Sequence, residues 1–191
     1  MRIALVGADV EENLGIEMVA AALAAARHRV EVVAYNDHDQ LDAVLAELRA
    51  RRPGLIGLGM QFQHRARDFV MLARGLRAEG YRGHLTAGGQ YATLAADELV
   101  RQEAALDSVV LHDGETTVVE LTRALERREP VAEIAGRVVR GVDGAPRRTA
   151  PTRGIGSISR ASRPTPTSRS ANANTPSSGN IARGTSSRTR R

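Results

Sequence analysis

Apolar runs alternate with amphipathic segments along the first 130 residues of the chain. Short apolar runs predict five buried parallel strands, over residues 2–7, 30–35, 55–60, 83–87 and 108–111. Apolar side chains at helical spacing predict a helix after each strand, over residues 14–26, 37–51, 65–79, 92–102 and 115–127. Because parallel strands need crossover helices, this order predicts an α/β fold with a doubly wound five-stranded parallel sheet, Rossmann-like or flavodoxin-like.

The pattern changes after the last predicted helix. Residues 136–149 hold two short strand-like runs on either side of Gly141-Val142-Asp143-Gly144, which is typical of a β-hairpin. From Pro151 onward the chain is mostly Ser, Thr, Arg, Pro, Asn and Gly, a composition that buries too little apolar surface to offset the entropy of ordering. We therefore predict an α/β domain over residues 1–130, a hairpin connector over 131–150 and a disordered tail over 151–191.

The net charge of +5 conceals two different regions. Residues 1–150 carry 19 Arg and 22 acidic residues, whereas residues 151–191 carry 8 Arg and no acidic residue. The predicted domain is therefore mildly acidic and the tail strongly basic. Because the tail also lacks aromatic residues for base stacking, it predicts at most non-specific, salt-sensitive binding to nucleic acid.

The absence of cysteine excludes disulfides, thiolate nucleophiles and a cysteine-held iron–sulfur cluster. No apolar run reaches the length that spans a membrane, and the chain opens without a signal-peptide pattern. These features predict a cytoplasmic protein that does not enter a membrane.

Four loops should meet at one edge of the predicted sheet, because the carboxyl ends of parallel strands lie on the same side. They cover residues 8–15, 60–64, 88–91 and 112–117. The first loop has neither a dinucleotide fingerprint nor a phosphate-binding Walker motif, and its two glutamates would repel a phosphate. A bulky and largely neutral ligand fits this edge better than a nucleotide does.

Each of these loops also has a purely structural explanation. Asn13 is equally suited to cap the helix that begins at Leu14, and Asp113 or Thr116 to cap the last helix. Taken alone, the pair Gly88-Gly89 is more typical of a tight strand–helix turn than of close approach by a ligand.

Three segments together carry a resemblance to a known family. They are Glu11-Glu12-Asn13-Leu14-Gly15 after the first strand, Gly88-Gly89-x-Tyr91-Ala92-Thr93 after the fourth, and Gly114-Glu115-Thr116 at the last helix. In order and spacing they resemble the amino-terminal cobalamin-binding domain of cobalamin-dependent radical S-adenosylmethionine enzymes, over residues 1–149.

The resemblance implies a corrinoid held over the strand ends, with its nucleotide tail between the sheet and the helices. The residues that it assigns to cofactor binding are Glu12, Asn13, Leu14, Gly15, Met60, Gln61, Phe62, Gly88, Gly89, Gln90, Tyr91, His112, Gly114 and Glu115.

The chain departs from related patterns in three places. The D-x-H-x-x-G motif of cobalamin mutases is absent after Asp9, which implies cobalamin bound without a histidine below the cobalt. The family often has Gly-His at Arg27-His28, which predicts backbone strain before the second strand. After Thr149 the family would continue into a catalytic domain with a C-x-x-x-C-x-x-C loop, where this chain has its arginine-rich tail. An out-of-frame or truncated gene copy would explain that tail, and a separate catalytic chain is then a candidate partner.

The sequence assigns no metal-ligating or catalytic residues. No two histidines have the i, i+4 spacing of a helical metal site, and no set of nucleophile, base and orienting group is evident. The chain is therefore not expected to be catalytic by itself, and the resembling family consists of radical S-adenosylmethionine methyltransferases and related enzymes. The competing interpretation is a flavodoxin-like domain that binds a small ligand or a nucleotide and no corrinoid.

Overall fold

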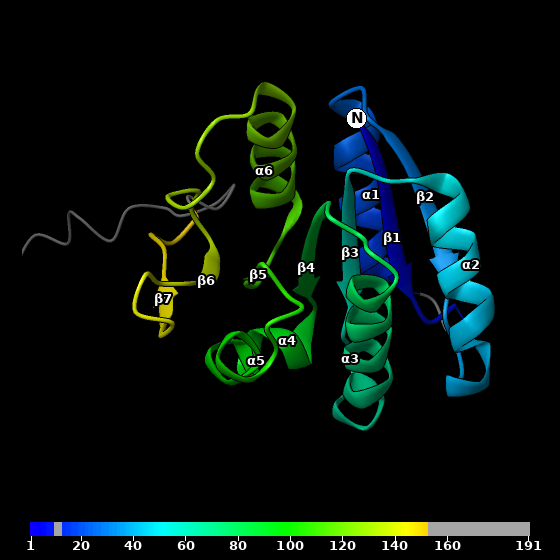
Figure 1. The fold of residues 1–191 in the computed structure, drawn as a ribbon. Helices are drawn as coiled ribbons and strands as arrows, with labels where there is room; N and C mark the ends of the chain where they lie inside the picture. Colours follow the sequence, from blue (N-terminus) through cyan, green and yellow to red (C-terminus); the bar gives the residue numbers. More distant parts are fainter. Residues whose placement is uncertain (10–12, 153–191) are drawn as a thin grey trace, which may run out of the picture. The chain divides into compact units, whose positions relative to one another are not determined.

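The structure is a computed structural model that describes residues 1–9 and 13–152 (Figure 1). Glu11 and Glu12 of the first loop lie outside the described residues, and so does almost all of the predicted tail. The predictions of tail disorder and of nucleic-acid binding through the tail therefore fall outside the described part of the chain.

Strands and helices alternate in the predicted order, and two further strands follow the last helix. The strands are β1 (Arg2–Gly7), β2 (Arg29–Ala34), β3 (Leu55–Gly59), β4 (His84–Gly88), β5 (Ser108–Val110), β6 (Arg137–Arg140) and β7 (Pro146–Arg148). The helices are α1 (Leu14–Ala25), the 3₁₀-helix η1 (His38–Gln40), α2 (Leu41–Arg51), α3 (Gln63–Ala78), α4 (Gln90–Leu94), α5 (Ala96–Gln102) and α6 (Glu115–Arg127).

The strands form one sheet in the order β2-β1-β3-β4-β5-β6-β7. The first five strands are parallel, which confirms the predicted doubly wound α/β class, but the predicted count of five is wrong. The hairpin β6–β7 pairs antiparallel with β5, with Ser108 opposite Val139 and Val110 opposite Arg137, so the sheet has seven strands. The open edge of β5 gives the hairpin a backbone to pair with, and local turn signals do not reveal such long-range pairing.

Helices cover both faces of the sheet (Figure 1). On one face, the strand residues Ile56, Leu58 and Leu85 pack with apolar side chains of α2, α3, α4 and α5 in the larger core cluster. On the other face, Leu5 and Val110 pack with α1 and α6 in a smaller cluster. We call these the packed face and the cleft face.

Local details differ from the prediction at two helices and agree with it at one turn. The helix predicted over residues 92–102 begins earlier, at Gln90, and breaks at Ala95 into α4 and α5. The helix predicted from Asp37 starts as the 3₁₀ turn η1. Arg27 has φ = 66°, a left-handed conformation that a non-glycine residue rarely adopts, so the predicted strain before β2 is confirmed.

Candidate functional site

A cleft of about 200 Å³ opens on the cleft face, near the carboxyl ends of β3 and β4 and between α1 and α6. It brings together eight of the predicted site residues: Asn13, Gly15, Gln61, Gly88, Gly89, His112, Gly114 and Glu115. The predicted convergence of four loops thus produces a real concave surface at this edge. Clefts at the carboxyl ends of strands are the usual ligand sites of open α/β sheets.

The floor of the cleft is nearly bare of large side chains. Side chains alternate between the two faces of a strand, so β3 turns Gly57 and Gly59 to this face while Leu58 points to the packed face. On β4, Thr86 and Gly88 line the cleft in the same way. Gly57 and Gly59 stay half-buried although β3 lies in the middle of the sheet, so the helices leave the floor accessible between them.

The two glycines after β4 have different roles. Gly89 has φ = 101°, and a Cβ atom there would lie 2.8 Å from the carbonyl oxygen of Met60, so the turn itself requires glycine. A Cβ atom on Gly88 would lie 3.9 Å from its nearest neighbours, which is an ordinary contact distance. Turn geometry therefore accounts for Gly89, and the sterics of the turn do not account for Gly88.

Helix capping is confirmed at one side of the cleft and wrong at the other. The Asn13 side chain accepts a hydrogen bond from the backbone N–H of Ile16 (3.3 Å) and donates one to the carbonyl of Ala8 (3.1 Å), so it caps α1. At α6 the N-cap is Gly114, and neither Asp113 nor Thr116 caps the helix. A Cβ atom on Gly114 would lie 3.0 Å from Cγ1 of Val110, so close packing against β5 favours glycine there.

His112 lies on the rim of the cleft in an uncommon backbone conformation. Its φ is 53°, its side chain is exposed, and its backbone N–H donates a hydrogen bond to Oγ1 of Thr93 (3.0 Å). This bond ties the loop after β5 to α4. Among the described residues, His112 is the one histidine that lines the cleft.

The remaining predicted site residues lie away from the cleft. Met60 is fully buried in the core of the packed face, and Tyr91 packs against the same core. Leu14, Phe62 and Gln90 are exposed and do not line the cleft, and Glu12 is outside the described residues.

The walls of the cleft are apolar and were not predicted from the sequence. They consist mainly of Leu5, Ile16, Met18, Val19, Val110 and Val118. The end of the Ile16 side chain lies over both Gly7 and Gly59, since a Cβ atom on either glycine would clash with it. The alternation of glycine in Leu55-Ile56-Gly57-Leu58-Gly59 is the sequence signal that could have located the floor.

The family model of the B12 binding domain matches residues 3–122, more than half of the chain. The chain belongs to the B12-binding domain family. This confirms the resemblance to the cobalamin-binding domains of radical S-adenosylmethionine enzymes. No curated protein matches the chain in sequence.

Solved structures with this fold include three cobalamin enzymes. OxsB, a cobalamin-dependent S-adenosylmethionine radical enzyme with aqua-cobalamin and S-adenosylmethionine bound, is 16% identical with a TM-score of 0.68, over 79% of this chain and 22% of that chain. TsrM from Kitasatospora setae, a radical S-adenosylmethionine methyltransferase, is 19% identical with a TM-score of 0.67, over 78% of this chain and 30% of that chain. The methanol:cobalamin methyltransferase complex MtaBC from Methanosarcina barkeri is 17% identical with a TM-score of 0.53, over 65% and 45%. The chain thus spans less than a third of the length of OxsB and TsrM.

A row of hydrogen-bonded polar side chains lies beneath the cleft of this B12-binding domain. The Thr86 hydroxyl lies 2.9 Å from Oγ of Ser108, which lies 3.0 Å from Nε2 of His84. Burial, reinforced by the charges of Arg137 and Arg77 and opposed by Asp107, lowers the pKa of His84 to about 4. His84 is therefore neutral near pH 7.

Asp107, His84 and Ser108 together have the composition of a catalytic triad, which was not predicted from the sequence. Oδ2 of Asp107 lies 3.9 Å from Nδ1 of His84, on the side of the ring opposite Ser108. Ser108 is fully buried, however, and its hydroxyl already contacts Thr86. Because a substrate has no access to it, we interpret the arrangement as structural.

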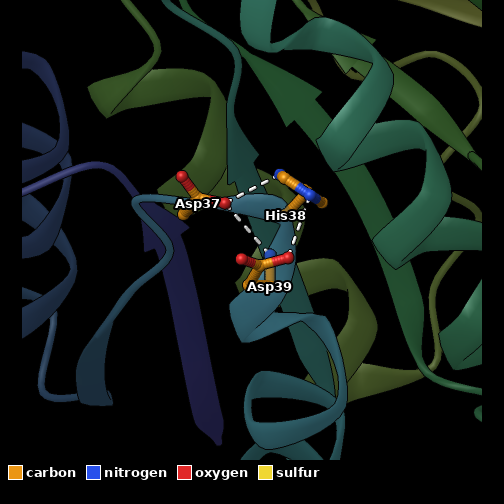
Figure 2. Close-up of side chains that lie close together, drawn as sticks. All are labelled: Asp37, His38 and Asp39. Atoms are coloured by element: carbon orange, nitrogen blue, oxygen red, sulfur yellow. Dashed lines mark hydrogen bonds and ion pairs between the residues drawn. The ribbon is translucent and has the colours of Figure 1, made fainter.

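A second polar cluster consists of the consecutive residues Asp37, His38 and Asp39, at the start of η1. Figure 2 shows the His38 ring linked to both carboxylates. Its Nδ1 lies 2.7 Å from Asp37 and its Nε2 lies 2.9 Å from Asp39. The backbone N–H of Asp39 donates to the Asp37 carboxylate, and this bond is the main cause that lowers the pKa of Asp37. Potential ligand atoms of the three lie within 4.8 Å of one another, but all three are exposed. Hydrogen bonding at the helix start explains the cluster without a metal.

None of the helices in the described ranges is both long and apolar enough to cross a membrane.

Proposed function

We propose that this domain binds a cobalamin, with the corrin ring at the carboxyl edge of the sheet and the nucleotide tail in the cleft between α1 and α6. The observation that carries the proposal is the bare floor of Gly57, Gly59, Thr86 and Gly88 in the middle of the sheet. Glycines in a central strand weaken packing, so a floor of this kind is expected where a ligand takes the place of side chains. The match to the B12 binding domain family supports the same assignment.

The residues present fit such a group. The apolar walls suit the flat heterocycle of a nucleotide tail, and the Thr86 hydroxyl, which bonds to Ser108, leaves the floor without a free charged group. Asn13, Gln61 and the first turn of α6 at Gly114 supply hydrogen-bonding groups at the rim. When bound, a corrinoid supplies a redox-active cobalt centre, and the residues of this chain bind and orient it.

We further propose that the cobalt has no histidine of this chain below it. The loop after β1 lacks the D-x-H-x-x-G motif. His112 lines the cleft, but it lies on the rim in the loop after β5 and not in the loop after β1. Electron paramagnetic resonance of the reduced Co(II) protein tests this directly, because a coordinating nitrogen splits the cobalt lines. We expect no nitrogen splitting. Splitting that disappears in His112→Ala would overturn the proposal and assign His112 as the ligand.

Visible absorption spectroscopy after incubation with hydroxocobalamin and desalting tests binding itself. We expect the protein to retain the corrinoid chromophore. Cobinamide, which lacks the nucleotide tail, should be retained much more weakly if the tail occupies the cleft. Equal retention of cobinamide and cobalamin would leave the cofactor but overturn the placement of the tail.

Folded protein that stays colourless with both corrinoids would contradict the proposed function as a whole. Circular dichroism on the same sample supplies the check on folding. Such a result would favour a flavodoxin-like domain that binds another small ligand.

We also propose that the domain works with a catalytic chain that carries the radical S-adenosylmethionine chemistry. The methanol:cobalamin methyltransferase MtaBC, which shares this fold, is a complex, and the cleft of this chain holds no accessible nucleophile paired with a base among the described residues. Large apolar side chains stay exposed on α1, α4 and the loop after β3, at Leu14, Met18, Leu94 and Phe62. Size-exclusion chromatography with candidate catalytic chains tests the association.

The cytoplasmic location of the protein stays a prediction.

A further inference from the structure

Arg137 is the largest side chain that is fully buried among the described residues. It belongs to β6 and faces the α6 side of the sheet, in register with Val110 and two residues before Val139. A strand position on this face would ordinarily hold an apolar residue. An ionised guanidinium in such a place needs a specific partner, because an uncompensated buried charge costs several kcal/mol.

The protein satisfies this guanidinium only in part. Nε donates a hydrogen bond to the carbonyl of Ile134 (3.4 Å), and Nη2 donates one to the carbonyl of Val131. Nη1 is buried and has no hydrogen-bond partner within the described residues. Burial, together with the charge of Arg147, lowers the pKa of Arg137 to about 10, so the group remains charged at neutral pH.

Arg137 lines a pocket of about 490 Å³ that is separate from the corrinoid cleft. Its polar lining is Arg82, His84, Asp107, Arg137 and Arg140, and its apolar lining includes Leu106, Leu125, Val131 and Val139. We call this the arginine pocket. His84 and Asp107 lie at the amino ends of β4 and β5, so the pocket opens toward the edge of the sheet opposite the cleft.

The charges in the arginine pocket are unbalanced. The Asp107 carboxylate is already engaged, since it accepts a hydrogen bond from Nη2 of Arg77 (2.7 Å) and another from the backbone N–H of Leu85 (2.7 Å). Arg82 is exposed, and Arg140 donates to the carbonyl of Glu103 (3.3 Å), a neutral acceptor. Three guanidinium groups therefore line one concave surface with a single carboxylate that is turned to other donors.

We propose that the arginine pocket binds a small oxyanion, the carboxylate or phosphate group of a small molecule. Arg137 is 0% exposed, so a small shift of the pocket lining is needed to open Nη1 to a ligand. An oxygen of such a group would then give Nη1 the acceptor that it lacks, since planar guanidinium groups bind carboxylates and phosphates through paired hydrogen bonds. Arg82 and Arg140 would hold the rest of the anion at the mouth. The apolar lining would pack against a short carbon chain attached to it.

Isothermal titration calorimetry of the full chain tests the proposal, with inorganic phosphate and succinate as probes at constant ionic strength. The matched pair of variants is Arg137→Met and Arg123→Met. Both remove one positive charge, but Arg123 is exposed on α6 and lies outside the pocket, so non-specific attraction by other arginines is equal in the two proteins. Methionine fills the buried volume without leaving an unpaired charge.

We expect saturable binding of one equivalent of succinate or phosphate, unchanged in Arg123→Met and weakened by about tenfold or more in Arg137→Met. Saturation by succinate alone would identify a carboxylate ligand, and saturation by phosphate alone a phosphate ligand. No saturable binding of either probe, or equal affinity in the two variants, would overturn the proposal and leave Arg137 as a structural residue.

Arg82→Gln provides a second variant that does not depend on replacing a buried residue. Arg82 is exposed, so its loss should leave folding intact and weaken the anion by a smaller factor, about threefold. Retention of hydroxocobalamin by Arg137→Met serves as the folding check, because the corrinoid cleft shares no residue with the arginine pocket.

Discussion

The two faces of the sheet differ in how completely side chains fill them. Ile56 and Leu58 of β3 are almost inaccessible in the core of the packed face, whereas Gly57 and Gly59 of the same strand leave a cleft on the other side. Most buried polar side chains follow the same division, because Thr86, Ser108, Thr117, Thr122 and Arg137 belong to the cleft side or to α6 and β6. The exception is Glu103 after α5, which pairs with Arg74 of α3 (2.8 Å). Five consecutive residues of one strand therefore serve both faces: Ile56 and Leu58 pack the core, and Gly57 and Gly59 form the floor of the proposed binding cleft.

This division separates two kinds of substitution within a single strand. We expect a change at Ile56 or Leu58 to act on the free energy of unfolding, and a change at Gly57 or Gly59 to act on corrinoid affinity.

The largest effect is expected from Leu58→Ala on the packed face. Leu58 is 1% exposed, so truncation removes apolar contacts and leaves a cavity in the larger core cluster. We expect the free energy of unfolding to fall by about 3 kcal/mol, measured by urea denaturation. Corrinoid affinity of the folded variant should be unchanged. A variant of wild-type stability that loses the corrinoid would break the division between the faces.

The pH dependence of stability should arise in part from the cleft face, through His84. Its pKa is lowered to about 4 in the folded protein and is about 6.5 in the unfolded chain. Above about pH 6.5 neither state carries the proton, so the full stability is present. Between about pH 6.5 and 4 only the unfolded state binds it, and up to about 3 kcal/mol of stability is lost.

Urea denaturation of the wild type and of His84→Gln at several values across this pH range measures the contribution. The carboxylates titrate in both proteins, so the difference in slope isolates His84. We expect the variant to lose less stability on acidification. Identical slopes would mean that His84 is not held neutral in the folded protein.

Gly57→Val should act on binding and leave stability nearly intact. The added Cβ would lie 2.9 Å from Cδ2 of Leu5, the flexible end of a side chain that can shift. Valine also suits a strand, so we expect a change of less than about 1 kcal/mol in the free energy of unfolding.

The valine side chain would occupy the floor of the cleft, and we expect corrinoid affinity to fall by about tenfold or more, equivalent to about 1.4 kcal/mol. Titration of hydroxocobalamin followed by its absorbance measures this. Ala46→Val, on the exposed surface of α2, is the matched control for added bulk. Unchanged affinity in Gly57→Val would contradict the placement of the tail.

The smallest effect is expected from Asn13→Ala, because Asn13 both caps α1 and lines the cleft. Loss of the cap at α1 should cost about 1 kcal/mol of stability, seen as a lower Tm. Asn13→Ser retains a capping side chain and should restore most of it. Corrinoid affinity that falls in Asn13→Ala and stays low in Asn13→Ser would show a direct contact of the Asn13 amide with the ligand.

Much of this fold follows from periodicity along the chain. The five parallel strands and the helices between them have strong local patterns, and the convergence of their loops follows from parallel pairing. The pairing of β6 with β5 was not predictable in this way, because it joins residues separated by a helix and a loop. The break at Ala95 was also missed, since alanine favours helix on both sides of it.

The candidate site was predicted at its rim and missed at its floor and walls. Glycines in loops, such as Gly88 and Gly114, draw attention by their position after a strand or before a helix. Ile16 and Val118 look like ordinary core residues of amphipathic helices, and only the three-dimensional gap between α1 and α6 shows that they face a cleft. The arginine pocket was missed for a related reason, because Arg137 in a short hairpin strand is indistinguishable in sequence from an exposed arginine.

The hairpin that extends the sheet also protects one of its two edges, the one opposite β2, from pairing with other chains. An open strand edge is a template for pairing with other chains, yet the outer strand β7 has only three residues and begins with Pro146, which has no N–H to donate. Its two arginines are held by ion pairs, Arg147 with Glu133 (3.0 Å) and Arg148 with Asp97 (2.8 Å). Strand-by-strand aggregation at this edge is therefore blocked by the chain itself, and the domain does not depend on a neighbouring protein for that protection.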